Sequence, residues 1–163
     1  MNRNRQSAFT IVELLIVIIV IAILAAISIV AYNGVQGRAS DAAIKADLNA
    51  IQKKLRIVKV DNGRFPSVYA ELPTDVKLTK NAYADRNNAY LCVDTDNDVF
   101  AFGAASKSGK YFSVTSNGGI QEESSMAGNY TCTLIGRTWG ETGTYVRQFY
   151  SGGTSTWNAP WNG

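Results

Sequence analysis

Residues 9–30 read FTIVELLIVIIVIAILAAISIV, and this run decides the architecture of the chain. It contains a single charged side chain, that of Glu13, among 22 residues. About 20 apolar residues suffice for a helix to cross the hydrocarbon core of a bilayer. The preceding segment, residues 1–8, is short and carries Arg3 and Arg5, and basic residues usually flank a span on its cytoplasmic side. The sequence therefore predicts one membrane-spanning helix, with its N-terminus in the cytoplasm and the rest of the chain outside.

Glu13 is the unusual residue of this run, because a carboxylate inside a span is costly and usually marks a functional site with a partner. Its position alone leaves two interpretations open. Glu13 lies four residues after Phe9, so its side chain can reach the headgroups at the inner interface. Alternatively, it pairs with a cation that shares its apolar environment.

The basic leader, the small residue Ala8 and the string FTIVELLIV together resemble the class III signal of the type IV pilin superfamily, which includes type IV pilins and the pseudopilins of type II secretion. The resemblance covers residues 1–33, about one fifth of the chain. It implies that a prepilin peptidase cleaves between Ala8 and Phe9 and methylates the new amine of Phe9. It also implies that Glu13 pairs with the N-terminal amine of a neighbouring subunit. Ala8 stands where the family usually has Gly.

The same resemblance implies a location and a set of partners. The precursor is expected to lie in the cytoplasmic (inner) membrane as a single-pass protein with its head outside. After processing, the subunits are expected to form a homo-oligomeric filament, an extracellular pilus, through their N-terminal helices. The implied partners are the membrane, the prepilin peptidase and the pilus assembly machinery.

The helix is predicted to continue beyond the apolar run. Apolar residues recur at spacings of four, three, four and three, which draws one stripe along a helix, at Ile44, Leu48, Ile51, Leu55 and Val58. Asn62-Gly63 supplies a stop signal. We expect a long helix over residues 9–62 whose first half is transmembrane and whose second half is amphipathic.

The C-terminal region, residues 63–163, has the pattern of a small β-rich head. Short β-prone runs separated by turn signals occur at residues 90–93, 99–102, 111–114, 130–134 and 145–150, and Ile120 follows an Asn117-Gly118 hairpin signal. Residues 64–88 are expected to form a loop, with room for one short helix. The predicted fold class is α+β, with the long helix packed on an antiparallel sheet. Three segments result: a cytoplasmic leader (1–8), the helix (9–62) and the head (63–163).

Composition excludes several classes of function. The chain has no histidine, which removes a Ser-His-Asp triad and a His-based zinc site. No carboxylate pair or phosphate-binding loop stands out, so we do not expect an enzyme. Loss of residues 1–8 would lower Lys plus Arg from 16 to 14 against 13 acidic residues, so the basic balance is weak evidence for nucleic-acid binding, and no specific nucleic-acid partner is expected.

Two smaller features are candidate sites. Cys92 and Cys132 both lie in the part predicted to be outside the cytoplasm, where an even pair is most often a disulfide, the alternative being two free thiols. Asp94, Asp96 and Asp98 alternate as calcium ligands can. However, Val99 stands where a calcium-binding EF-hand loop has glycine, which favours a polar hairpin turn and no cofactor.

The sequence thus predicts a structural subunit of a type IV pilus-like filament, without distinguishing adhesion, twitching motility or DNA uptake. A pseudopilin of a type II secretion system is the alternative within the family. A monomeric binding domain on an uncleaved membrane anchor is the alternative of another class.

Overall fold

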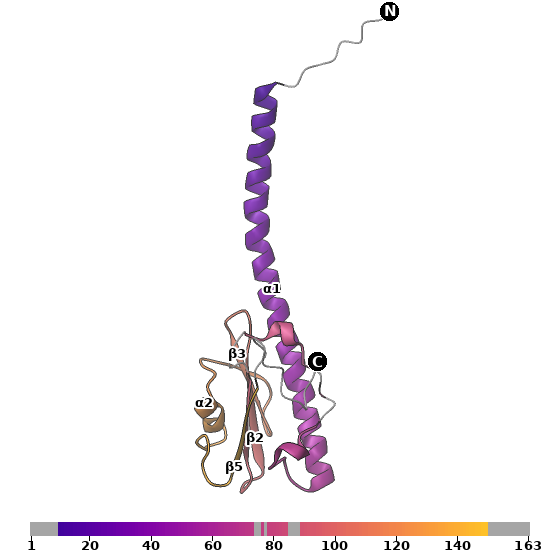
Figure 1. Ribbon diagram of the computed structural model, residues 1–163, viewed down its shortest axis with the longest axis vertical. Coiled ribbons are helices and arrows are strands. Elements are labelled where there is room, and N and C mark those ends of the chain that lie inside the picture. Colours follow the sequence, from indigo (N-terminus) through magenta and orange to yellow (C-terminus); the bar gives the residue numbers. More distant parts are fainter. Residues whose placement is uncertain (1–9, 74–75, 77, 85–88, 150–163) are drawn as a thin grey trace, which may run out of the picture. The chain divides into compact units, whose positions relative to one another are not determined.

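The computed structural model of the protein describes residues 10–73, 76, 78–84 and 89–149 (Figure 1). The chain divides into two compact units, Met1–Gln36 and Gly37–Gly163, which we call the N-terminal unit and the head unit. One helix, α1 (Ile11–Asn62), contributes to both and has 52 residues. The long helix predicted over residues 9–62 is confirmed over this range.

The N-terminal unit contains the apolar part of α1. Every residue from 10 to 36 is exposed. The most apolar window of α1 has a mean hydropathy of 3.4 and none of it is buried. By length and composition, α1 is the one helix of the described residues that could cross a membrane.

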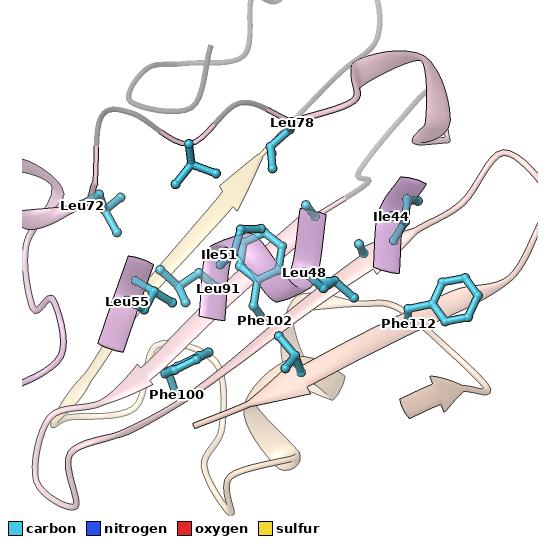
Figure 2. Packing of buried hydrophobic residues seen from close by; sticks show 14 of the residues in the cluster. Ile44, Leu48, Ile51, Leu55, Leu72, Leu78, Leu91, Phe100, Phe102 and Phe112 are labelled. Atoms are coloured by element: carbon cyan, nitrogen blue, oxygen red, sulfur yellow. The ribbon is translucent and has the colours of Figure 1, made fainter. Parts of the chain in front are cut away.

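In the head unit, the predicted apolar stripe of α1 forms the core. The side chains of Ile44, Leu48, Ile51 and Leu55 are fully buried, whereas Val58 is only half-buried. They pack against side chains from the sheet, which Figure 2 shows facing the helix, at Leu91, Phe100, Phe102 and Phe112. Spacings of three and four residues place apolar side chains on one face of a helix, and that face here meets the sheet.

The sheet is antiparallel and has the order β4-β3-β2-β1-β5. Its strands are β1 (Ala89–Asp94), β2 (Val99–Ala105), β3 (Tyr111–Thr115), β4 (Gln121–Glu123) and β5 (Thr144–Phe149). The first four follow one another as hairpins, and β5 returns to pair with the free edge of β1. The predicted α+β fold is confirmed. Two 3₁₀ turns lie in the connection from α1, η1 (Tyr69–Glu71) and η2 (Lys80–Ala82), where one short helix was anticipated.

The prediction of a strand over residues 130–134 is wrong, because this segment lies in a short helix, α2 (Gly128–Thr133). The hydroxyl of Thr131 donates to the carbonyl of Ala127 at 3.2 Å, and that of Thr133 donates to the carbonyl of Tyr130 at 2.7 Å. Such bonds are compatible with a helical turn but do not favour it. What holds the segment on the sheet is its packing against β1 and the disulfide from Cys132 to Cys92. The tertiary context therefore decides the structure of this segment.

The face of the sheet opposite α1 is covered by α2 and its flanking loops (Figure 1). Gly103 in β2 leaves room for the end of the Met126 side chain, which would have to move if residue 103 carried a Cβ. Trp139 meets the ring of Tyr90 edge-on, with the ring centroids 5.6 Å apart. The predicted tail beyond residue 149 lies outside the described residues.

Candidate functional site

The start of α1 holds Glu13 in a reciprocal set of hydrogen bonds with Thr10. The backbone N–H and the hydroxyl of Thr10 donate to Oε2 of Glu13, at 2.9 and 2.7 Å. In return the backbone N–H of Glu13 donates to the hydroxyl oxygen of Thr10, at 3.2 Å. This is a capping box, in which two backbone donors of the first helical turn are satisfied by side chains.

The capping box fixes where the carboxylate of Glu13 lies. Unpaired N–H groups at a helix N-terminus give that end a partial positive charge, which favours a carboxylate there. Both described bonds from Thr10 engage the same oxygen, Oε2. The donor in Thr10 is an internal peptide N–H, so cleavage between residues 8 and 9 would leave it in place. Ala8 and Phe9 lie outside the described residues, so the cleavage position, the methylation of Phe9 and the pairing of Glu13 stay predictions.

The role of Thr10 was missed in the analysis of the sequence, although a signal for it was present. Thr10 and Glu13 have the Thr-x-x-Glu spacing of a capping box directly before an apolar run. The two interpretations given for Glu13, contact with headgroups and pairing with a cation, both place its partner outside its own helix. Its nearest described partner is in its own helical turn.

The outer surface of α1 beyond Glu13 is apolar on all sides. Large aliphatic side chains around the whole helix are about half exposed or more, including Leu14, Leu15, Ile18, Ile21 and Leu24 at 48–59%. A helix that is apolar all round is normally buried, either in a membrane or among other helices. The surface is therefore suited to hydrocarbon and to other helices of its own kind.

In the head unit, a disulfide joins the sheet to α2. Cys92 in β1 is bonded to Cys132 in α2, and the two residues are 40 apart in sequence. Both are fully buried. The bond ties α2 to a central strand of the sheet.

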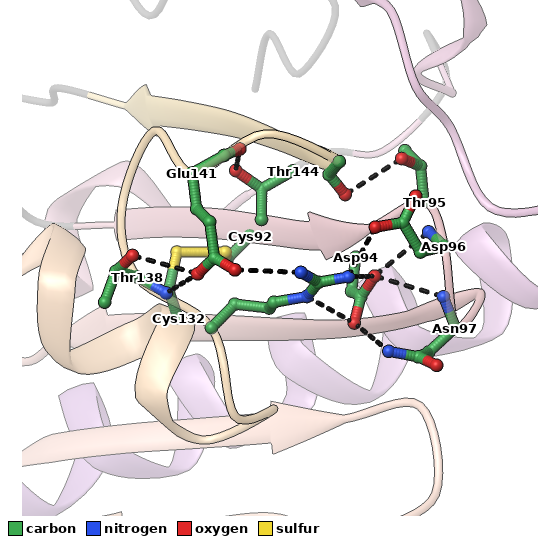
Figure 3. A network of polar contacts seen from close by, with 11 residues as sticks. Cys92, Asp94, Thr95, Asp96, Asn97, Cys132, Thr138, Glu141 and Thr144 are labelled. Carbon is green, nitrogen blue, oxygen red and sulfur yellow. Dashed lines mark hydrogen bonds and ion pairs between the residues drawn. A yellow bond between two sulfur atoms is a disulfide. The ribbon is translucent and has the colours of Figure 1, made fainter.

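Next to the disulfide, Arg137 bridges the segment after α2 and the turn after β1 (Figure 3). Its Nε and Nη2 donate to the two oxygens of Asp94, at 2.8 and 2.9 Å. Nη2 also donates to Asp96 and Nη1 to Glu141, at 2.6 and 2.9 Å. A guanidinium that contacts three carboxylates with this geometry fixes the positions of all three.

These contacts explain the electrostatics of the predicted calcium candidate. Hydrogen bonds from Arg137 hold the pKa of Asp94 well below its ordinary value, against the opposing effect of burial. Asp98 has different partners from Asp94 and Asp96. It pairs with Lys59 at 2.8 Å and accepts a hydrogen bond from the backbone N–H of Phe65 at 2.7 Å. Within the described residues, no group of three or more His, Cys, Asp or Glu side chains is arranged to hold a metal ion. Asp94 and Asp96 are bonded to Arg137, and Asp98 to Lys59 and Phe65.

The chain is similar to known proteins in its N-terminal segment and over about half of its length. Residues 3–29 match the family model described as "Prokaryotic N-terminal methylation motif". The chain is 30% identical over 90 residues to "Type II secretion system core protein G" of Aeromonas hydrophila, and 34% identical over 77 residues to the protein of the same name in Pseudomonas aeruginosa. These matches span 55% and 47% of this chain but 62% and 54% of the relatives, less than two thirds of either.

A third relative is covered more fully. The chain is 34% identical over 97 residues to "Type IV wide pilus major component PilA4" of Thermus thermophilus, which covers 56% of this chain and 73% of that protein. No solved structure matches the chain. An apolar helix that continues into the core of a small antiparallel sheet defines a pilin-like α+β subunit. With the N-terminal motif and these relatives, the chain belongs to the type IV pilin superfamily.

Proposed function

We propose that the protein is a structural subunit of a type IV pilus-like filament, made first as a membrane-anchored precursor. The observation that carries the proposal is the apolar surface of α1 over residues 11–35, which no part of the described chain covers. Before assembly, lipid covers it. After assembly, the same surface is covered by the corresponding helices of other subunits.

The exchange of lipid for helices is energetically feasible because lipid tails and aliphatic side chains are about equally apolar. Association of such helices is driven by packing and by polar contacts between them, with little contribution from a hydrophobic force. A polar group therefore has a large influence on which arrangement forms. In α1 that group is Glu13, near the end that would lie deepest in a filament.

In the proposed filament, the carboxylate of Glu13 pairs with the N-terminal amine of Phe9 in an adjacent subunit, as the prepilin resemblance implies. An ammonium and a carboxylate that are both removed from water need each other as counter-charges. The capping box supports this role, because Thr10 holds Oε2 at the start of the helix and so presents the carboxylate in one orientation. The pair would set the register between neighbouring helices.

The head unit is proposed to lie outside the cytoplasm. Its disulfide supports this location, since disulfides persist in oxidising compartments. The basic residues before α1 support a cytoplasmic N-terminus. The heads would then form the outer surface of the filament.

A second candidate function is that of a pseudopilin in a type II secretion system. It is favoured by the relatives named as core protein G of that system. Deletion of the gene separates the two candidates. Loss of surface filaments with normal protein secretion indicates a pilus, whereas loss of secreted enzymes from the medium indicates a pseudopilus.

The proposal is tested by determining the intact mass and the first residue of the protein purified from cells and from sheared surface filaments. A chain that begins at Phe9 with one added methyl group, present in the sheared fraction, is the expected result. An intact chain beginning at Met1 and confined to the membrane would contradict the proposal and support a monomeric anchored binding domain.

A further inference from the structure

The hairpin between β2 and β3 is hydrogen-bonded to α1 near Gly37, where the head unit begins. The hydroxyls of Ser106 and Ser108 both donate to Oδ1 of Asp41, at 2.6 and 2.5 Å. A Cβ at Gly37 would lie 3.4 Å from the Cβ of Ser108, so helix and hairpin are in contact there. The tip of the hairpin therefore lies beside the first turns of α1 in the head unit.

The 3₁₀ turn η2 is brought to the same end of the head unit. The backbone N–H of Lys107 donates to the carbonyl of Ala82 at 2.9 Å, and that of Ala84 donates to the carbonyl of Ala105 at 2.9 Å. Figure 1 shows this turn, in pink, next to α1 at the end of the sheet where the helix arrives. Three separate segments of the chain thus meet at one end.

These three segments carry a cluster that we call the basic end, made of Arg38, Lys80, Lys107 and Lys110. Arg38, Lys107 and Lys110 are exposed and Lys80 is half-buried. Three acidic residues are close by: Asp41, which is bonded to the two serines, Asp47, which accepts the backbone N–H of Thr79 beside Lys80 at 2.7 Å, and Glu122, which pairs with Lys110 at 2.9 Å. The balance at this end is positive among the described residues. The opposite end of the sheet, at the turn after β1, carries Asp94, Asp96 and Asp98.

The basic end is close to the apolar run along the chain. Arg38 follows Val30 by eight residues in α1, which corresponds to a rise of about 12 Å along a helix at 1.5 Å per residue. The headgroup layer of a bilayer begins where the hydrocarbon ends and is about 5–8 Å thick on each side. Attraction between fixed charges extends over about 8 Å at physiological ionic strength. When residues 9–30 are in the hydrocarbon, Arg38 is within electrostatic reach of the headgroups.

We propose that the basic end of the head unit docks on the phosphate groups of anionic phospholipids at the outer surface of the membrane. Arg38 and Lys107 make the main contacts, since Lys110 is shared with Glu122. The inference rests on the proposed function only in that the chain is anchored in a membrane before assembly. Docking holds the head against the bilayer, and these contacts must break when a subunit leaves the membrane for a filament.

The test is a lysine-labelling experiment on the full chain in lipid vesicles. One set of vesicles is made of phosphatidylcholine, and the other of phosphatidylcholine mixed with phosphatidylglycerol. Labelling by a water-soluble acylating reagent is then quantified by mass spectrometry at Lys107 and at Lys53, an exposed lysine 15 residues past Arg38 on α1. On the anionic vesicles, labelling of Lys107 is expected to fall about fivefold and to recover at high salt, because each basic residue near such a surface adds roughly that preference. Labelling of Lys53 should stay constant.

A matched pair of variants separates docking from general charge effects. Arg38→Glu should abolish most of the protection of Lys107, whereas Lys53→Glu, which makes the same change in net charge, should leave it intact. Equal labelling of Lys107 on the two kinds of vesicle would overturn the proposal. So would protection that rises with the protein-to-lipid ratio and ignores lipid charge, because a second copy of the chain would then be the cover.

Failure of the anchor is recognised separately. Release of the chain from the vesicles at alkaline pH would contradict the anchored precursor, and docking with it. A chain that stays in the vesicles while Lys107 remains unprotected would contradict docking alone.

Discussion

The two halves of α1 differ in what surrounds them, although they belong to one helix. Leu15, in the first half, is 48% exposed, whereas Leu48, in the second half, is fully buried against the sheet. Both halves are rich in aliphatic side chains, but polar residues are few in the first half, where they include Glu13 and Ser28, and frequent in the second. The second half is thus stabilised by its own chain, and the first half depends on an environment that the chain does not supply.

Removal of the disulfide is the change expected to affect the head unit most. The bond closes a loop of 40 residues, for which the chain-entropy model gives about 4 kcal/mol. Replacement of both Cys92 and Cys132 by serine should lower the unfolding free energy of the head by about that amount. Near-ultraviolet circular dichroism of the full chain in detergent, during a denaturant titration, measures it. Wild type under reducing conditions is the control and should behave alike. An unchanged midpoint in both would show that packing alone holds α2.

The contrast within α1 can be tested with the same substitution in each half. Leu48→Ala leaves a cavity in the core and should cost about 3 kcal/mol of head stability. Leu15→Ala should leave the unfolding of the head unchanged, since its side chain contributes nothing to that core. The denaturant titration described above measures both. Equal effects of the two substitutions would mean that the halves are not energetically separate.

A smaller and pH-dependent effect is expected at Arg137. Asp94 has a pKa below its ordinary value of 3.8 in the folded state, chiefly because of Arg137, so the pair stabilises the fold fully above about pH 4 and progressively less as the pH falls through the folded-state pKa. Arg137→Ala should therefore lower the melting temperature at pH 7 and have a diminishing effect toward pH 2. Arg137→Lys should be intermediate, because it keeps the charge but loses the paired contact with Asp94. A deficit that stays constant from pH 7 to pH 2 would assign the effect to packing.

Most of the fold can be predicted from the sequence, because helices and strands leave periodic patterns of apolar residues over short stretches of chain. The spacing of Ile44, Leu48, Ile51 and Leu55 predicts which face of α1 is buried, and that face forms the core. The β-prone runs predict β1, β2, β3 and β5 at nearly their observed positions. For the remaining strand, β4, Asn117-Gly118 marks the preceding turn. Such patterns reflect burial on one side of an element, which a sequence records directly.

Contacts between distant residues could not be predicted in the same way. Arg137 lies 43 residues from Asp94, and no local pattern relates them. The prediction for the segment of α2 was wrong for a related reason. Its threonine and tyrosine residues favour a strand, whereas a residue 40 positions away, Cys92, bonds it to the sheet. At the candidate assembly site, the spacing of Thr10 and Glu13 is enough to predict the capping box. A partner of Glu13 in another subunit depends on how subunits pack, which the residues of one chain do not specify.

The central claim is that Glu13 acts between subunits, beyond its bonds to Thr10, and incorporation into filaments tests it most directly. Glu13→Ala removes the counter-charge of a buried amine at every contact between subunits, so more than about a tenfold drop in incorporation is expected, with synthesis, membrane insertion and processing intact. Glu13→Asp, which keeps the charge with a shorter reach, should be intermediate. Thr10→Val serves as a control, since it removes both bonds of the Thr10 hydroxyl but keeps the carboxylate and its bond from the Thr10 backbone N–H.

The measurement is the ratio of subunits in sheared filaments to processed subunits left in the membrane, for wild type and each variant. A low ratio for Glu13→Ala with a normal amount of processed protein in the membrane is the predicted result. Equal ratios for wild type and Glu13→Ala would contradict the pairing and would leave Glu13 as no more than a cap of its own helix.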